Sequence, residues 1–319
     1  MTIFSQVETF LKIHCLSQAP LLLALSGGSD SLCLFDCLLT YRKKYDTPFH
    51  VAHVDHGWRQ ESAAEAQTLR ELALLHDLPF HLKTLNPASI EGNLESGCRN
   101  ERYAFFSLIC NQFHCQGVLT GHHQNDHTET IFKRILEGAH WSRWGGLKSE
   151  NRIQGVRVLR PLLHVTKEEI RQMLVGANMK AFEDPTNRDT RFLRPRLRHS
   201  LLSRLSQEFG KDVEGNLVAI GRDASELTAY FEARLLPLLN ALQDDSSGAY
   251  LDLQSCLPES LVETKYLLRL LCAKLGFFLS REMIEQAAEA LQTNKSQRRF
   301  IMKKKELTID RRRIFIRSL

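Results

Sequence analysis

A short run of glycines and small polar residues, Ser26-Gly27-Gly28-Ser29-Asp30-Ser31, follows the apolar segment 21–25 (LLLAL) and precedes a segment with helical spacing. Two glycines let the backbone approach a ligand closely, and the N-terminus of a helix offers N–H groups to an anion. The loop therefore predicts a phosphate site. No lysine follows its glycines as in a Walker A loop, which favours binding a pyrophosphate that leaves over transfer of a terminal phosphoryl group.

Carboxylates and imidazoles recur further along the chain, in segments 53–59 (HVDHGWR) and 121–130 (GHHQNDHTET). His122, Asp126 and Glu129 have the spacing i, i+4 and i+7, which places them on one face of a predicted helix. Such a face is either simply solvated or holds the ammonium group of a substrate. The eight cysteines include no CxxC pair, which argues against a zinc ribbon or a redox motif.

The elements that must position these residues alternate along the first part of the chain. Short apolar runs predict strands, and the longer segments between them have helical spacing. Strands are predicted at 21–25, 49–54, 79–83 and 117–120, and helices at 30–44, 60–76, 99–115 and 124–137. This alternation is typical of a parallel sheet with helices on both faces, whose ligand sites lie beyond the carboxyl ends of the strands. Thr166 and Glu169 form a capping-box pattern that opens a further helix ending near Gly176.

The chain of 319 residues is long enough for two domains. We expect an α/β catalytic domain over 1–200 and a smaller, mainly helical domain over 201–319. Segments 298–309 and 312–317 are rich in β-forming residues and flank Asp310-Arg311, which predicts a terminal β-hairpin.

The net charge of +5 is concentrated in two places. Residues 295–317 carry a net +8 and residues 188–204 a net +5, so the remainder is acidic. This distribution favours a polyanionic partner. The N-terminus has no export signal and the longest early apolar run has seven residues, which predicts a cytoplasmic protein with no membrane partner.

The string SGGSDS at 26–31 resembles the signature of the PP-loop ATP pyrophosphatases. Segment 53–59 resembles the His-x-x-His-Gly-x-Arg turn of the tRNA(Ile)-lysidine synthase family, and 121–130 resembles its His-His-x-Asp-Asp-x-x-Glu-Thr stretch. Segment 183–198, in which EDPTN precedes a series of arginines, resembles its Asp-x-(Ser/Thr)-Asn and arginine-rich region. The chain departs from the family at Asn125, where the family has aspartate, and at Pro195, where it has asparagine.

The resemblance implies an ATP-dependent carbon–nitrogen ligase. Its substrates are free L-lysine and the tRNA(Ile) with a CAU anticodon, and its cofactors are ATP and Mg²⁺. The C2 oxygen of the wobble cytidine attacks the α-phosphate of ATP and displaces pyrophosphate. The lysine ε-amine then attacks C2 and displaces AMP.

Several residues are candidates for these steps. We assign ATP binding to Ser26, Gly27, Gly28, Ser29, Asp30, Ser31 and His53, and metal binding to Asp30. We assign lysine binding to Arg102, Asp126 and Glu129, and catalysis to Asp30, Asp126 and Glu129. We assign tRNA binding to Arg194, Arg196, Arg198, Lys303 and Lys305. Arg102 is chosen because a guanidinium group matches a carboxylate with two hydrogen bonds. Lys303 and Lys305 are chosen because alternate residues of a strand share one face.

Two other enzymes are consistent with parts of this pattern. A metal-dependent phosphoesterase could use His53, His56, His122, His123 and His127 as ligands, but it would leave the SGGSDS loop without a role. Another tRNA-modifying enzyme of the PP-loop type is the second alternative. The sequence leaves open whether the chain forms a homo-oligomer, how it distinguishes tRNA(Ile) from tRNA(Met), and which residue is the general base.

Overall fold

The structure, a computed structural model, describes residues 2–57, 62–90, 92–177, 179, 181–182, 196–245, 248–302 and 304–319. The chain divides into two compact units, Met1–Arg222 and Asp223–Leu319. The division falls inside the long helix α9 (Val213–Asn240). The domain boundary expected near residue 200 stays a prediction.

The first unit is built on a six-stranded sheet in the order β3-β2-β1-β4-β6-β5. The first five strands in that order are parallel, and β5 pairs antiparallel with β6 at one edge. The strands are β1 (Leu21–Ala24), β2 (Phe49–Asp55), β3 (Phe80–Thr84), β4 (Val118–Leu119), β5 (Glu150–Ile153) and β6 (Val156–Leu159).

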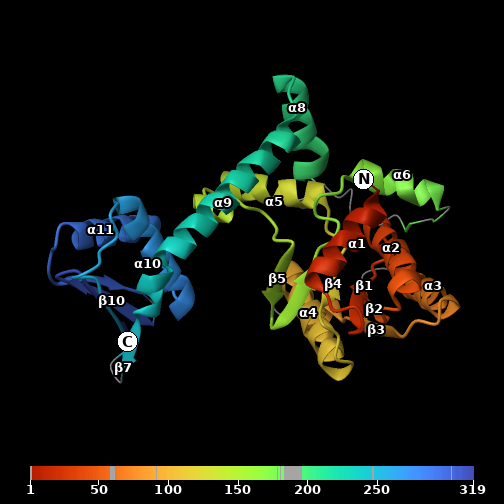
Figure 1. Ribbon diagram of the computed structural model, residues 1–319, viewed down its shortest axis with the longest axis horizontal. Helices are drawn as coiled ribbons and strands as arrows, with labels where there is room; N and C mark the ends of the chain where they lie inside the picture. Colours follow the sequence, from red (N-terminus) through yellow and green to blue (C-terminus); the bar gives the residue numbers. More distant parts are fainter. Residues whose placement is uncertain are drawn as a thin grey trace. The chain divides into compact units, whose positions relative to one another are not determined.

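Helices cover both faces of this sheet. On one face, Leu21 and Leu23 of β1 share a core with α1, α2, α3 and α6, and on the other Leu22 packs with the apolar side of α4. Figure 1 shows α1 and α2 beside the strands β1 to β3. The helices of this unit are α1 (Ile3–His14), α2 (Ser29–Tyr45), α3 (Ser62–Leu75), α4 (Leu94–Gln112), α5 (Gln124–Leu136), α6 (Lys167–Gly176) and α8 (Ser203–Phe209), with short helical turns at Pro87–Ser89, Trp141–Arg143 and Leu197–Leu202.

The predicted α/β architecture is confirmed, and its strands and helices lie within a few residues of the expected ranges. Helix α1 and the β5–β6 hairpin were not predicted. His122 is a correction: the helix α5 starts at Gln124 with His123 as its N-cap, so His122 precedes the helix and does not share its face with Asp126 and Glu129.

The second unit combines helices with an antiparallel sheet in the order β7-β8-β11-β10-β9. The expected hairpin is present, because β10 and β11 pair through a two-residue turn at Arg311 and Arg312, both with positive φ. The predicted first arm, 298–309, is not one strand, because the structure divides it into two antiparallel strands, β9 and β10. The sheet is also larger than predicted, since β7 and β8 extend it. The elements are α10 (Leu261–Leu275), α11 (Arg281–Gln292), β7 (Gln243–Asp245), β8 (Gly248–Asp252), β9 (Arg298–Ile301), β10 (Lys305–Asp310) and β11 (Arg313–Ser318).

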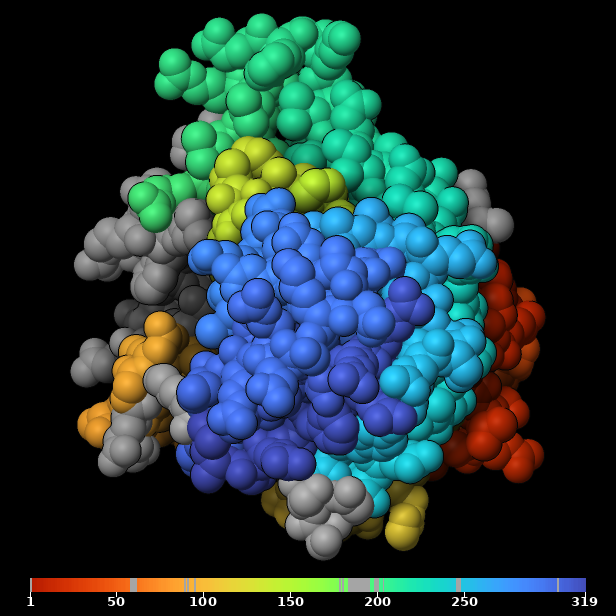
Figure 2. Space-filling view, turned by 90° about the vertical axis from the view of Figure 1, so that its left-hand side faces the viewer, coloured from red at the N-terminus to blue at the C-terminus, as the bar shows by residue number. Residues whose placement is uncertain are grey.

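Helix α11 packs against β9 and β10, and the C-terminal residues of this unit face the viewer in Figure 2. Within the described ranges, no helix combines the length and the apolarity that a bilayer crossing requires.

Candidate functional site

The parallel strands β1, β2 and β4 bring the three loops that follow them to the same end of the sheet. From β1 the chain continues to β2 and β3 on one side, and it then returns to β4 on the other side of β1. The loops after β1 and β4 therefore flank the point where the direction of winding reverses. Open α/β sheets bind ligands at such a point, beyond the carboxyl ends of the strands.

The loop 26–31 turns from β1 into α2 through internal hydrogen bonds. Gly27 has φ of +82°, which a residue with a side chain rarely adopts, and Gly28 is the N-cap of α2. The buried Ser31 hydroxyl donates to Gly28 O (3.0 Å) and accepts from Ser26 N (3.2 Å). Ser31 thereby shapes the loop, while the N–H groups of the first turn of α2 lie where a helix binds anions.

Phe182 packs directly on the glycine turn. Its N–H donates to Gly27 O (3.0 Å), and a Cβ built on Gly27 would lie 2.3 Å from Cδ2 of its ring. The second glycine of the motif has no such neighbour, since a Cβ on Gly28 would meet only Ser26 Oγ at 3.6 Å. Gly27 is thus required both for its backbone angle and for this close packing.

Asp30 is held by a lysine from a distant helix. The Lys167 ammonium at the start of α6 donates to Asp30 Oδ1 (2.5 Å) and to Ser29 Oγ (2.7 Å). Lys167 has no signal in the sequence that links it to Asp30, because the two lie 137 positions apart in the chain. Its capping box, which Thr166 and Glu169 form as predicted, was the one local signal near it.

His123 lies between the loop and the acidic helix α5. Its side chain is 2% exposed, and its Nε2 lies 3.7 Å from Asp30 Oδ2 and 3.5 Å from Asp126 Oδ2. Its Nδ1 accepts the N–H of Asn125 (3.2 Å), so a neutral ring carries its hydrogen on Nε2, towards the two carboxylates. His123 thus connects the phosphate loop to the carboxylate that the sequence assigns to lysine.

Asp126 and Glu129 lie one turn apart on α5. Asp126 Oδ2 accepts the backbone N–H of His123 (3.1 Å) in a capping box that fixes the first turn of the helix. Glu129 is 4% exposed. A buried carboxylate beside a second one forms an anionic site that suits an ammonium group.

Gly121 brings the β4 loop against the first turn of α2. A Cβ on this residue would lie 2.9 Å from both Asp30 C and Ser31 N, closer than two such atoms can approach. These are backbone atoms, which cannot rotate away as the end of a side chain can. The contact therefore couples the position of the phosphate loop to the β4–α5 connection.

At the end of β2, His53 is 7% exposed and donates from Nδ1 to Leu25 O (2.8 Å). Burial lowers the pKa of His53. The ring is consequently neutral near pH 7, with Nε2 as an acceptor. Asp55 Oδ1 accepts the N–H of Gly57 (2.8 Å), which fixes the turn that follows the strand.

Asn125, which stands where the family has aspartate, makes hydrogen bonds that require an amide. Asn125 Oδ1 accepts the backbone N–H of Lys167 (3.1 Å), and its Nδ2 donates to Glu214 Oε2 (2.7 Å). An aspartate at this position would offer no donor and would place one carboxylate against another. The amide thus ties α5 to the first turns of α6 and α9.

The remaining predicted residues are placed as follows. Arg102 lies on α4 with its Cζ 5.4 Å from the Tyr103 ring centroid. Arg196 is exposed, and the Lys305 ammonium donates to Leu275 O at the end of α10 (2.6 Å). Arg194, Lys303 and the side chain of Arg198 lie outside the described residues.

The histidines do not assemble as the phosphoesterase hypothesis requires. Among the residues that the structure describes, no group of three or more histidine, cysteine or carboxylate side chains could hold a metal ion. His122 Nδ1 pairs with Thr120 Oγ1 (2.8 Å), and His127 Nδ1 accepts from Leu147 N (3.1 Å). Both rings have structural partners.

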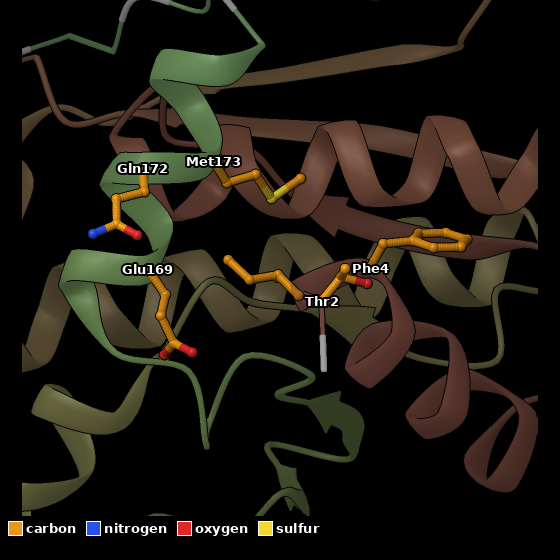
Figure 3. A pocket seen from close by; sticks show the side chains of 6 residues that line it. Thr2, Phe4, Glu169, Gln172 and Met173 are labelled. Carbon is orange, nitrogen blue, oxygen red and sulfur yellow. The ribbon is translucent and has the colours of Figure 1, made fainter.

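A cavity of about 350 Å³ lies between the first turn of α1 and the helix α6. Figure 3 shows Glu169, Gln172 and Met173 on α6 and Thr2 and Phe4 on the N-terminal segment, with Met173 extending towards that segment. Its lining includes none of the residues of the phosphate loop. The cavity is therefore separate from the residues that carry the chemistry.

Comparisons with known proteins show the family to which the chain is related. The model of the PP-loop domain family matches residues 2–205. A tRNA(Ile)-lysidine synthase from Protochlamydia amoebophila is 46% identical over 318 residues, covering 100% of this chain and 69% of the relative. One from Chlamydia pneumoniae is 36% identical, covering 85% of this chain and 84% of the relative.

A solved structure shares the fold. The U34-tRNA thiolase NcsA from Methanococcus maripaludis matches with a TM-score of 0.58 at 16% identity, covering 72% of this chain and 78% of that one. At that identity the likeness concerns architecture only. The PP-loop domain covers most of the chain, and a tRNA(Ile)-lysidine synthase is 46% identical over the whole chain, so the chain belongs to the tRNA(Ile)-lysidine synthase family of PP-loop ATP-dependent ligases.

Proposed function

We propose that this protein uses ATP to join free L-lysine to C2 of the wobble cytidine of tRNA(Ile) with a CAU anticodon. One observation carries the proposal: Asp30 and Asp126 both lie close to His123 Nε2. Asp30 belongs to the phosphate loop, which activation of the base by ATP requires. Asp126 belongs to the anionic site, which capture of an amine requires. The resemblance to relatives that are tRNA(Ile)-lysidine synthases supports the same reaction.

The phosphate loop binds the triphosphate of ATP. N–H groups at the start of α2 and the hydroxyls of Ser26 and Ser29 donate to phosphate oxygens, and His53 Nε2 accepts a hydrogen bond from the adenosine. Asp30 is a suitable Mg²⁺ ligand, since its side chain is 28% exposed and Mg²⁺ takes one or two protein carboxylates together with phosphate oxygens and water. When bound, Mg²⁺ neutralises charge on the departing pyrophosphate.

Asp126 and Glu129 hold the ε-ammonium group of lysine, and Arg102 receives its carboxylate. His123 donates from Nε2 towards Asp126 and keeps that carboxylate oriented. The amine must lose a proton before it attacks C2, and the two carboxylates lie where that proton would be received. The attack on C2 then displaces AMP, a far better leaving group than the oxygen of an unmodified cytosine.

The basic residues outside the pocket bind the tRNA backbone. We assign this role to Arg194, Arg196 and Arg198 at the end of the α/β fold and to Lys303 and Lys305 in the second unit. An anticodon loop presents unpaired bases, so the target cytidine leaves its stack at small cost. The partners are therefore tRNA and a free amino acid.

Ligation of labelled lysine tests the proposal. The purified protein is incubated with ATP, radioactive lysine and bulk bacterial tRNA, and we expect label in the RNA with one AMP and one pyrophosphate formed per lysine transferred. Omitting tRNA should stop both. ADP and phosphate as the main nucleotide products, or label that stays free while ATP is consumed, would contradict it.

The Asp126→Asn variant separates the lysine site from the ATP site. Removal of the charge weakens an ionic hydrogen bond to the ammonium group, so the KM for lysine should rise roughly 10- to 100-fold. The KM for ATP should stay within about twofold, because the amide oxygen of the introduced asparagine can still accept the N–H of the N-cap. Steady-state kinetics with each substrate varied in turn measures both values, and loss of ATP binding with unchanged lysine dependence would refute the assignment.

A further inference from the structure

We propose that Lys167 supplies, from helix α6, the cation that the PP-loop itself lacks, and that its ammonium group binds the pyrophosphate leaving from ATP. The inference rests on the proposed function. The loop 26–31 contains no lysine, yet an ammonium lies directly against two of its side chains, those of Ser29 and Asp30.

The contacts place this ammonium at the mouth of the anion-binding turn. Ser29 and Asp30 are the first two residues of α2, beside the N–H groups that would receive phosphate oxygens. Ser29 Oγ also donates to Asp30 Oδ1 (3.4 Å), so the three side chains form one cluster. An ammonium group has three N–H donors, and two are used in these contacts.

Lys167 is anchored by its backbone before any ligand arrives. Its N–H donates to Asn125 Oδ1, and Thr166 before it forms a reciprocal capping box with Glu169. The start of α6 is therefore fixed while the long side chain keeps its freedom. The fixed backbone of Lys167 positions the charge and still allows a small shift of the ammonium group.

The ion pair with Asp30 is easily exchanged. The two side chains are 30% and 28% exposed, and a partly exposed pair of this kind contributes little stability. A triphosphate carries more negative charge than one carboxylate, so the ammonium moves to it when ATP binds. When the cytidine oxygen attacks the α-phosphorus, the bond to the bridging oxygen breaks and pyrophosphate leaves with the electron pair. Lys167 stabilises that charge and transfers no proton.

A purely structural role is the alternative. In that case the lysine only holds Asp30 in place, and it competes with the ATP-bound metal for the carboxylate. Its removal would then leave pyrophosphate affinity unchanged or increase it. The two roles thus differ in the sign of their effect on one binding constant.

The test measures pyrophosphate binding to the whole protein by equilibrium dialysis with radioactive pyrophosphate and Mg²⁺, which requires no turnover. Lys167→Met should weaken binding about 10- to 100-fold, the loss expected for one charge-assisted contact. Lys167→Arg should stay within about threefold of the wild type. Lys133→Met is the matched control, because Lys133 also pairs with a carboxylate, Glu137, but lies on α5 away from the loop.

Kinetics provide the second readout. The inhibition constant of pyrophosphate and the KM for ATP should both rise in Lys167→Met, while the KM for lysine should not change. Unchanged or tighter pyrophosphate binding in Lys167→Met would overturn the inference, as would equal losses in Lys133→Met. If the wild type binds pyrophosphate through Lys167 but attaches no lysine to tRNA, the proposed function fails and the cation site stands. Circular dichroism confirms folding, and Lys167→Arg remains informative if Lys167→Met does not fold.

Discussion

Asp30→Asn is expected to reduce the rate of pyrophosphate release from ATP by roughly 10³-fold, the scale of loss when a preorganised charge-stabilising group is removed. The substitution keeps the shape of the side chain but removes its charge. Lys167 then loses its anionic partner, and the metal that accompanies ATP loses its proposed carboxylate ligand. Rapid-quench measurement of pyrophosphate at saturating tRNA and ATP gives the rate.

Thermal unfolding separates this effect from a loss of structure. The Asp30 carboxylate forms a partly exposed ion pair, so its removal should cost at most about 1 kcal/mol. Asp36→Asn is the matched control, since it makes the same change further along α2, and it should retain wild-type rates. A variant at Asp30 that folds normally and still releases pyrophosphate at more than about a tenth of the wild-type rate would exclude this aspartate from the ATP site.

The architecture of the first unit could be predicted because its signals are local. The run Leu21–Leu25 is apolar at every position, as a strand buried on both faces requires, and the glycine-rich loop follows it directly. When parallel strands alternate with helices, the carboxyl ends of all the strands lie at the same end of the sheet. The meeting of the 26–31 loop with Asp126 follows from that geometry without any knowledge of side-chain packing.

Lys167 could not be found in this way. Its contact with Asp30 depends on where α6 begins, and that position is fixed by Asn125, which was treated as a departure from the family pattern and not as a hydrogen-bond partner. Contacts between residues so distant in sequence carry no periodic signal. The amide of Asn125 pairs with Glu214, so the residue that departs from the family pattern has a hydrogen-bond partner far along the chain.

His123 was misjudged for a different reason. Its residue type suggested only a metal ligand, whereas it is the N-cap of α5 and lies between two carboxylates. His123 lies four residues after the end of β4 and three residues before Asp126, and this i, i+3 spacing of a capping box was the one local signal available. The second sheet was underestimated because β7 and β8 have only three and five residues, and β7 consists of polar residues alone.

Gly121→Ala should lower kcat/KM for ATP by at least about 10²-fold, the scale of loss when catalytic groups move by roughly 1 Å. The added methyl group would lie 2.9 Å from the backbone of Asp30 and Ser31, so the first turn of α2 must move away from the β4 loop. That movement separates Asp30 from His123 and opens the turn that receives phosphates. The overpacking should also cost about 1–3 kcal/mol of the free energy of unfolding, measurable by urea denaturation.

The matched control is Gly176→Ala. Gly176 lies at the end of α6, and a Cβ there meets no atom within 4 Å, so alanine should leave activity unchanged and stabilise the helix slightly. If the phosphate loop shifts in Gly121→Ala, the KM for ATP should rise and pyrophosphate release should slow. Binding of lysine should not change, because Asp126 and Glu129 lie on α5 beyond the contact. An alanine variant at Gly121 with normal ATP kinetics would show that the β4 loop, and not the phosphate loop, moves to relieve the contact. The ATP site would then tolerate displacement of the very connection that positions His123, and the role assigned to that histidine would have to be abandoned.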